Sequence, residues 1–161
     1  MSTHPTEKLA VILERETVES RWETHRWHLV AVVPDGGGAV RTLRDDPGHL
    51  QRLHPGFEVA LFPDEAEGYY LNVSSEEPSV FVAVRRDDSG DAYPFQATLS
   101  YNEAARWMDG GERVERVPAW PELAAWIGAW VEQNYRPEPK KRSKPRSFEG
   151  KEGRLREKGA R

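Results

Sequence analysis

The residues best suited to metal chemistry are two histidines that follow two aspartates. His49 and His54 come shortly after Asp45 and Asp46, and imidazole with carboxylate is a ligand set that transition metals accept. A helix would place positions five apart on different faces, and two prolines interrupt the same stretch. We therefore expect these histidines to be polar loop residues and predict no metal site.

A run of three glycines is the one candidate for a phosphate-binding loop. Successive backbone N–H groups can hold an anion, and Gly36, Gly37 and Gly38 offer such a run. The sequence, however, contains neither a dinucleotide-binding glycine pattern nor a Walker motif, and no helix pattern opens after the glycines. Pro34 and Asp35 precede them, so we expect an ordinary turn.

Nothing in the sequence marks a catalytic residue. There is no Gly-x-Ser-x-Gly motif, and the paired acids at 76–77 and 87–88 lie in polar segments typical of hairpin turns. Cysteine is absent, which excludes a thiolate nucleophile, thiolate metal sites and disulfides. We predict no catalytic residue and no cofactor, and we leave open whether the protein is an enzyme, with a non-enzymatic role favoured.

Tryptophan and arginine gather just before the apolar segment at 29–33. Arg21, Trp22, Arg26 and Trp27 lie within seven positions, and both residue types are enriched at the energetic centres of protein interfaces. Arg21, Trp22 and Arg26 are therefore our candidates for partner contact. The alternative is that Trp27, and Trp22 with it, anchors the core while the arginines pair with acidic neighbours.

Charge divides the chain near Tyr135. Residues 1–135 hold 12 Lys and Arg against 23 Asp and Glu, a formal −11, and residues 136–161 hold 11 against 4, a formal +7, which together give −4. A basic tail suits docking onto an acidic protein surface, whereas the acidic body repels nucleic acid and anionic membranes. The tail could also fold back on its own domain. The candidate contacts in the tail are Lys140, Lys141, Arg142, Lys144 and Arg146.

Composition predicts one domain with two unstructured ends. We expect a frayed segment at 1–8, a single α+β domain at 9–135 and a disordered tail at 136–161, because the tail has too little apolar surface to offset the entropy of ordering. The longest apolar run near the start is too short to span a bilayer. With no cysteine in the chain, these features favour the cytoplasm.

Apolar segments with short connections predict an antiparallel meander of about five or six strands. Residues 29–33 and 80–84 are rich in β-branched side chains, and we expect the first of these to be a strand buried on both faces and the second a central strand. Residues 39–55 show no periodicity and are predicted to form a long loop. The other expected strands are 9–14, 57–62, 69–73 and 95–101.

One or two helices are expected to pack on this sheet near its C-terminal end. Ser100 and Glu103 have capping-box spacing, and Asn102 is an alternative N-cap, so we expect a short helix that stops at Gly110 and Gly111. Pro121 suits the first turn of a second helix. Its apolar stripe, which must face the sheet, consists of Leu123, Trp126, Ile127, Trp130 and Val131.

Six short motifs, in order, resemble one known family. They are VILER at 11–15, SRW at 20–22, RWHLVAVVP at 26–34, YLNV at 70–73, EPSVFV at 77–82 and VERVP at 114–118. The family consists of short bacterial proteins of unknown function, typically encoded beside formate dehydrogenase genes and sometimes labelled as molybdopterin-guanine dinucleotide biosynthesis protein A. The resemblance covers residues 9–143 and carries no established mechanism.

The resemblance implies an accessory protein more readily than a nucleotidyltransferase. A guanylyltransferase of the labelled kind resembles a Rossmann-like fold with a glycine-rich loop after its first strand, whereas here Glu14 to Thr17 follow that strand. We expect a non-enzymatic accessory or assembly protein whose partner is a molybdenum or tungsten formate dehydrogenase subunit or maturation factor. The alternative is a cofactor-biosynthesis protein that binds a pterin or guanine nucleotide. A weaker alternative is a nucleic-acid-binding regulator that acts through the basic tail.

Overall fold

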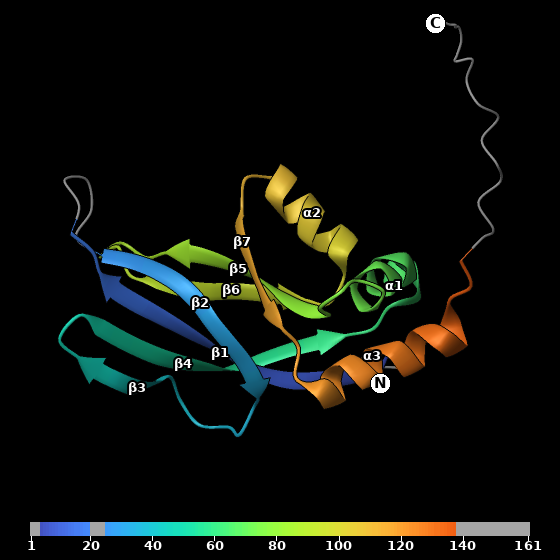
Figure 1. Ribbon diagram of the computed structural model, residues 1–161, viewed down its shortest axis with the longest axis horizontal. Helices are drawn as coiled ribbons and strands as arrows, with labels where there is room; N and C mark the ends of the chain where they lie inside the picture. The colour runs from blue at the N-terminus through green and yellow to red at the C-terminus, as the bar shows by residue number, and fades with distance from the viewer. Residues whose placement is uncertain (1–3, 20–24, 138–161) are drawn as a thin grey trace, which may run out of the picture.

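The described strands form two antiparallel sheets. A computed structural model (Figure 1) describes residues 4–19 and 25–137. One sheet has the order β2-β1-β4-β3 and consists of β1 (Thr6–Thr17), β2 (His25–Pro34), β3 (Arg41–Asp46) and β4 (His49–Ala60). The other has the order β6-β5-β7 and consists of β5 (Ser79–Arg86), β6 (Ala92–Thr98) and β7 (Arg113–Pro118). The predicted antiparallel α+β class is therefore confirmed.

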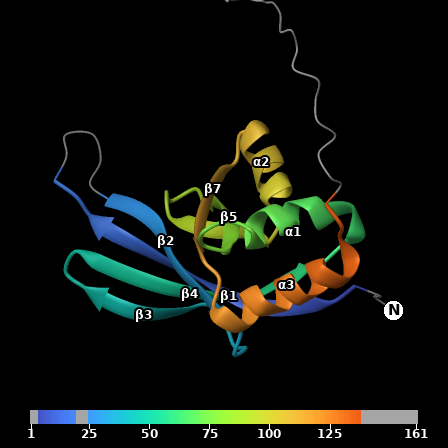
Figure 2. The same ribbon diagram turned by 45° about the vertical axis from the view of Figure 1, so that its right-hand side comes forward.

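Three helices complete the described part of the molecule. They are α1 (Ala66–Val73), which follows a 3₁₀ turn at Pro63–Glu65, α2 (Tyr101–Asp109) and α3 (Pro121–Asn134). Helices α1 and α3 lie side by side at one end (Figure 2), where the rings of Tyr69 and Trp130 meet edge to face with centroids 5.5 Å apart. None of the described helices has the length and apolar content that a bilayer crossing requires.

The core lies between the two sheets and the helix pair. Val80, Val82 and Val84 of β5 point into it, whereas Phe81 faces the opposite side of the three-stranded sheet, where α2 packs. All residues from Ser79 to Val84 are buried, so β5 is the central strand that the sequence predicts. The predicted stripe of α3 is also confirmed, because Leu123, Ile127 and Val131 are buried, and Trp126 and Trp130 pack beside them half-buried.

The prediction of a long loop at 39–55 is wrong. This stretch forms β3 and most of β4, joined by a tight turn in which Gly48 adopts φ 93°. Pro55 and Gly56, which as a dipeptide indicate a turn, form a bulge inside β4 where the pairing with β1 shifts register between Leu9 and Val11. Gly56 takes φ 91° there. A turn dipeptide can thus bend a strand without ending it.

The prediction of a strand at 69–73 is also wrong, because these residues belong to α1. Periodicity cannot separate a short apolar run in a strand from one in a helix. The position of Pro63 in the first turn, with Asp64 and Glu65 after it, indicates a helix start. Buried Tyr69 and Asn72, three positions apart, follow helical spacing.

Strand β2 is an edge strand and is not buried on both faces. It pairs only with β1 in the described sheet, and Val30 on it is 37% exposed. A register shift between Ile12 and Leu13 leaves Val30 without a partner opposite it. The β-branched residues at 29–33 therefore predicted a strand correctly, but they did not predict that this strand lies at the edge of the sheet.

Candidate functional site

A groove on the surface between α2 and β7 is the best candidate for a binding site. It has a volume of about 180 Å³ and is lined mainly by apolar side chains. Phe81 of β5 forms its floor, with the Tyr101 ring edge to face at 6.1 Å. The remaining lining residues are Ala104, Ala105, Met108, Val114, Glu115 and Arg116.

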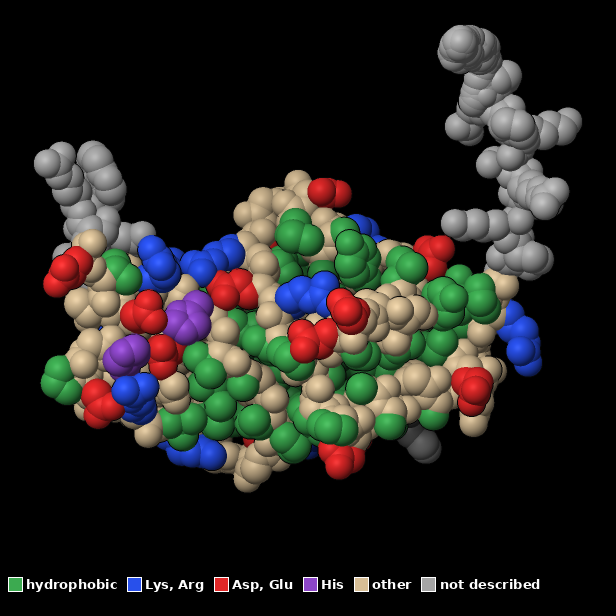
Figure 3. Space-filling model, viewed as in Figure 1, with side chains coloured by type: hydrophobic (Ala, Val, Ile, Leu, Met, Phe, Trp, Pro, Cys, Tyr) green, Lys and Arg blue, Asp and Glu red, His purple; other side chains and the backbone are tan. Residues whose placement is uncertain are grey.

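The α2 wall of the groove exposes apolar surface to solvent. Tyr101 is 48% exposed and Met108 is 52% exposed, although both are large and apolar. Figure 3 shows hydrophobic side chains gathered over the region where α2 lies in Figure 1. Contiguous exposed apolar surface of this kind is typical of recognition sites.

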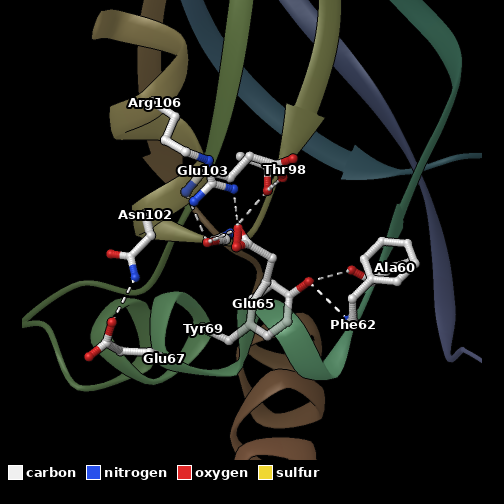
Figure 4. A network of polar contacts seen from close by, with 10 residues as sticks. Ala60, Phe62, Glu65, Glu67, Tyr69, Thr98, Asn102, Glu103 and Arg106 are labelled. Carbon is white, nitrogen blue, oxygen red and sulfur yellow. Dashed lines mark hydrogen bonds and ion pairs between the residues drawn. The ribbon is translucent and has the colours of Figure 1, made fainter.

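A network of polar contacts fixes α2 in place (Figure 4). The Ser100 hydroxyl accepts a hydrogen bond from the Glu103 backbone N–H at 3.1 Å, which confirms the predicted N-cap. The same hydroxyl donates to Glu65 at 3.1 Å, and Arg106 donates to that carboxylate at 2.6 Å. Because Glu65 lies at the start of α1, this carboxylate joins the two helices.

Tyr69 anchors α1 to the chain that enters it. Its hydroxyl donates to the Ala60 carbonyl at 3.0 Å and accepts from the Phe62 N–H at 3.1 Å. Burial raises the pKa of Tyr69 to about 12. The helix that contacts α2 through Glu65 and Ser100 is therefore itself joined to the segment that precedes it.

The electrostatics of the groove are set by one arginine. Arg116 lies over the Phe81 ring, 5.1 Å from its centroid, and donates to the Ser79 hydroxyl and the Glu77 carbonyl. Among the described residues, no carboxylate pairs with Arg116. The nearby Glu115 carboxylate is already engaged, because it accepts from Leu29 N–H at 2.9 Å and pairs with Arg113. The groove thus combines apolar walls with an unneutralised cation.

Of the predicted partner-contact residues, Arg26 alone lies within the described residues. It is exposed on β2, in register beside Glu16. Trp27, the next residue, is 2% exposed, with Arg15 and Arg52 each 5.9 Å from its ring. The core-anchor interpretation of Trp27 is therefore confirmed. Outside the described residues lie Arg21, Trp22, Lys140, Lys141, Arg142, Lys144 and Arg146.

The glycine run lies in the loop that joins β2 to β3, which are at opposite edges of the sheet, and does not form the ordinary turn that the sequence predicts. Asp35 accepts a hydrogen bond from Gly37 N–H at 2.8 Å and another from Gly56 N–H at 3.0 Å. A carboxylate of the protein thus occupies donors that a phosphate would need, and its charge would repel a phosphate.

The prediction that His49 and His54 are loop residues is wrong, because both belong to β4. The strand register places His49 beside Glu16 and His54 beside Val11, which are on opposite faces of the four-stranded sheet. His49 lies next to Glu14, and His28 reaches the same carboxylate from β2. A hydrogen bond from Gln51 and the two histidines lower the pKa of Glu14, against the opposing effect of burial.

Sequence reasoning missed both the groove and this cluster for the same reason. The groove needs β7 beside α2, and the cluster needs β4, whose first half falls in the stretch predicted to be a loop. The available signal was spacing: Glu14 and Glu16 are two apart, as are His49 and Gln51. On strands, such pairs share a face.

Comparison with known proteins identifies a family and no activity. A family model described as "Protein of unknown function (DUF3305)" matches residues 8–144. No curated protein and no solved structure matches the chain. Because the family model covers most of the sequence, the chain belongs to the DUF3305 family of proteins of unknown function.

Proposed function

We propose that this protein is a cytoplasmic, non-enzymatic accessory protein that binds a protein partner through the groove between α2 and β7. The observation that carries the proposal is that half-exposed Tyr101 and Met108 lie in one groove with Arg116, which has no carboxylate partner among the described residues. Rigid apolar anchors beside a cation are the elements of an interface hot spot.

The groove chemistry defines the segment that fits it. Apolar walls favour an apolar side chain of the partner, and Arg116 favours a carboxylate next to it. Sites for small-molecule ligands usually occupy about 300 to 1,000 Å³, whereas this groove has about 180 Å³. Its size therefore suits one or two anchoring side chains better than a dinucleotide cofactor.

For the identity of the partner, the resemblance described above supports a molybdenum or tungsten formate dehydrogenase subunit or maturation factor. Such enzymes require assembly and cofactor insertion, and a protein without a catalytic site can take part in either by binding a subunit. The basic residues predicted to act in the tail, Lys140 to Arg146, would add salt-dependent attraction to the same acidic partner.

The test is binding between the purified full chain and formate dehydrogenase subunits from the same host. Met108→Glu places a carboxylate in the groove and should weaken binding at least tenfold, because it removes an apolar anchor and repels the carboxylate of the partner. Leu71→Glu is the matched control, since Leu71 is 41% exposed on α1 and does not line the groove. The Leu71→Glu variant should bind the formate dehydrogenase subunits as tightly as the parent chain does.

Two results would overturn the proposal. One is the absence of binding to any formate dehydrogenase subunit or maturation factor. The other is a change in tryptophan fluorescence on addition of GTP or a pterin, which would favour the cofactor-biosynthesis alternative.

A further inference from the structure

The outer face of the four-stranded sheet carries a cluster of histidine and glutamate side chains that the proposed function does not use. In the strand register, Glu14 of β1 lies between His28 of β2 and Gln51 of β4, and Glu16 lies between Arg26 and His49. Residues 14 and 16 share a face of β1. Three strands thus bring two carboxylates and two imidazoles together.

In three of these residues, Glu14, Glu16 and His28, the ligand atoms lie close enough together to bind one metal ion, and His49 contacts Glu14 from the other side. Glu14 Oε2 lies 3.5 Å from His28 Nε2 and 3.3 Å from His49 Nδ1. With metal–ligand bonds of about 2.0 to 2.2 Å, neighbouring ligands of a tetrahedral or octahedral ion are separated by roughly 3 to 3.5 Å. Ligand atoms of Glu14, Glu16 and His28 all lie within 4.8 Å of one another.

Glu14 is held as a ligand would be. Its side chain is 9% exposed, and its other oxygen, Oε1, accepts a hydrogen bond from Gln51 Nε2 at 2.7 Å. This contact fixes the carboxylate and directs Oε2 toward the two imidazoles, as outer-shell residues do at metal sites.

Charge in the cluster favours a cation. No lysine or arginine in the described part of the chain forms an ion pair with Glu14, whose ion pairs are with the two histidines. Arg44, in register beside Gln51, donates to Asp46 at 2.5 Å and also attracts Glu14 electrostatically, and exposed Arg26 lies beside Glu16. A divalent ion would add positive charge next to a carboxylate that is nine-tenths buried.

We propose that Glu14, Glu16 and His28 form a binding site for a divalent transition-metal ion, with Gln51 and His49 as the residues that position Glu14. An imidazole beside two carboxylates favours zinc and its neighbours over magnesium and calcium, which prefer sites made only of oxygen. The His28 side chain is about a third exposed, so a bound ion keeps a side open to solvent or to another molecule.

The experiment uses the full chain without an affinity tag, stripped of metal with a chelator and titrated with Zn²⁺ by calorimetry. One ion should bind per chain and raise the melting temperature, because a ligand specific for the folded state stabilises it. Mg²⁺ at the same concentration should neither bind measurably nor raise the melting temperature. Glu14→Gln and His28→Gln should each lower the Zn²⁺ affinity at least tenfold.

His25→Gln is the matched control. His25 is exposed on the same strand as His28 and lies on the opposite face, in register with Thr17, so its loss should leave Zn²⁺ binding intact. If a Glu14 variant does not fold, Glu16→Gln at a more exposed position tests the same site. Failure of the parent chain to bind Zn²⁺, or equal binding by the parent and the His28 and Glu16 variants, would overturn the proposal. Neither outcome depends on partner binding at α2.

Discussion

Buried polar side chains do much of the positioning in this protein. Asn72, which is 1% exposed, donates to the carbonyls of Ser79 and Leu99 and accepts from Ser79 N–H. One amide thereby joins α1 to β5 and to the segment before α2. Its apolar neighbours in the sequence gave no sign of this role, because a side chain that satisfies distant backbone groups is recognisable only once those groups are adjacent.

At the residue scale, Tyr69→Phe should lower the free energy of unfolding by about 0.5 to 1.5 kcal/mol near neutral pH, through loss of the contacts with Ala60 and Phe62. It should also change the alkaline behaviour. Because the pKa of Tyr69 is raised from 10.0 to about 12 in the folded state, its contribution to stability is complete below pH 10 and is lost as the pH rises toward 12.

Urea unfolding measured at about pH 8 and about pH 11 tests this prediction. The parent chain should lose more stability between the two conditions than Tyr69→Phe does. Equal losses would show that the Tyr69 hydroxyl ionises as readily in the folded protein as in the unfolded chain. Tyr101→Phe, on an exposed ring, is the control. This variant should lose as much stability between the two conditions as the parent chain does.

At the scale of elements, local sequence signals identified α2, α3 and β5 well. Each has a signal within its own residues: the cap at Ser100, the apolar stripe from Leu123, and the unbroken apolar run of β5. Of the missed elements, β4 and α1 depend on partners far along the chain, and β3 in turn depends on β4, its one partner in the described sheet. β4 is held by pairing with β1 over its whole length, which overrides the local effect of Pro55 and Gly56.

Two helical glycines, Gly68 in α1 and Gly128 in α3, give opposite predictions for the same substitution to alanine. A Cβ at Gly68 would lie 2.0 Å from Ser100 Oγ and 3.2 Å from Asn102 N, so Gly68→Ala should force the helices apart and cost about 1 to 3 kcal/mol of stability. Gly128 in α3 has nothing within 4 Å of its Cβ position. Gly128→Ala should therefore stabilise the protein by about 0.5 to 1 kcal/mol.

Thermal unfolding of the Gly68→Ala and Gly128→Ala variants tests both predictions. Opposite signs are expected from the same chemical change in two helices. A neutral Gly68→Ala would mean that α1 and α2 are packed less closely than the contact with Ser100 requires, and the groove wall would then not be rigid.

For the whole molecule, the two candidate sites lie on different layers. The groove lies between α2 and the three-stranded sheet, and the histidine–glutamate cluster lies on the outer face of the four-stranded sheet. Figure 3 shows histidine side chains among acidic ones, well apart from the apolar surface over α2. The sequence predicted the antiparallel α+β class, but not the division of the strands between two sheets, since that depends on which strands pair.

The basic tail gives a prediction at the same scale. Changing the predicted contacts Lys140, Lys141, Arg142, Lys144 and Arg146 to Gln should weaken binding of an acidic partner about threefold to tenfold at low ionic strength, and less at high ionic strength. The matched control changes five later cations of the tail to Gln, namely Lys151, Arg154, Arg156, Lys158 and Arg161.

Binding isotherms at two salt concentrations measure the difference. The control carries the same change in net charge, so a specific contribution of the first five residues appears as a larger loss of affinity in the first variant. Equal losses would assign the effect to net charge alone, and no loss in either variant would exclude the tail from the interface.

The most direct test of the central claim is site-specific crosslinking in cells that express formate dehydrogenase. A photoreactive amino acid at position 108, where Met108 is 52% exposed on the groove wall, should crosslink to a formate dehydrogenase subunit or maturation factor. The same group at position 71, where Leu71 is 41% exposed on α1, should not. Crosslinks from position 71 but not 108, or from neither position, would contradict partner binding at the groove between α2 and β7.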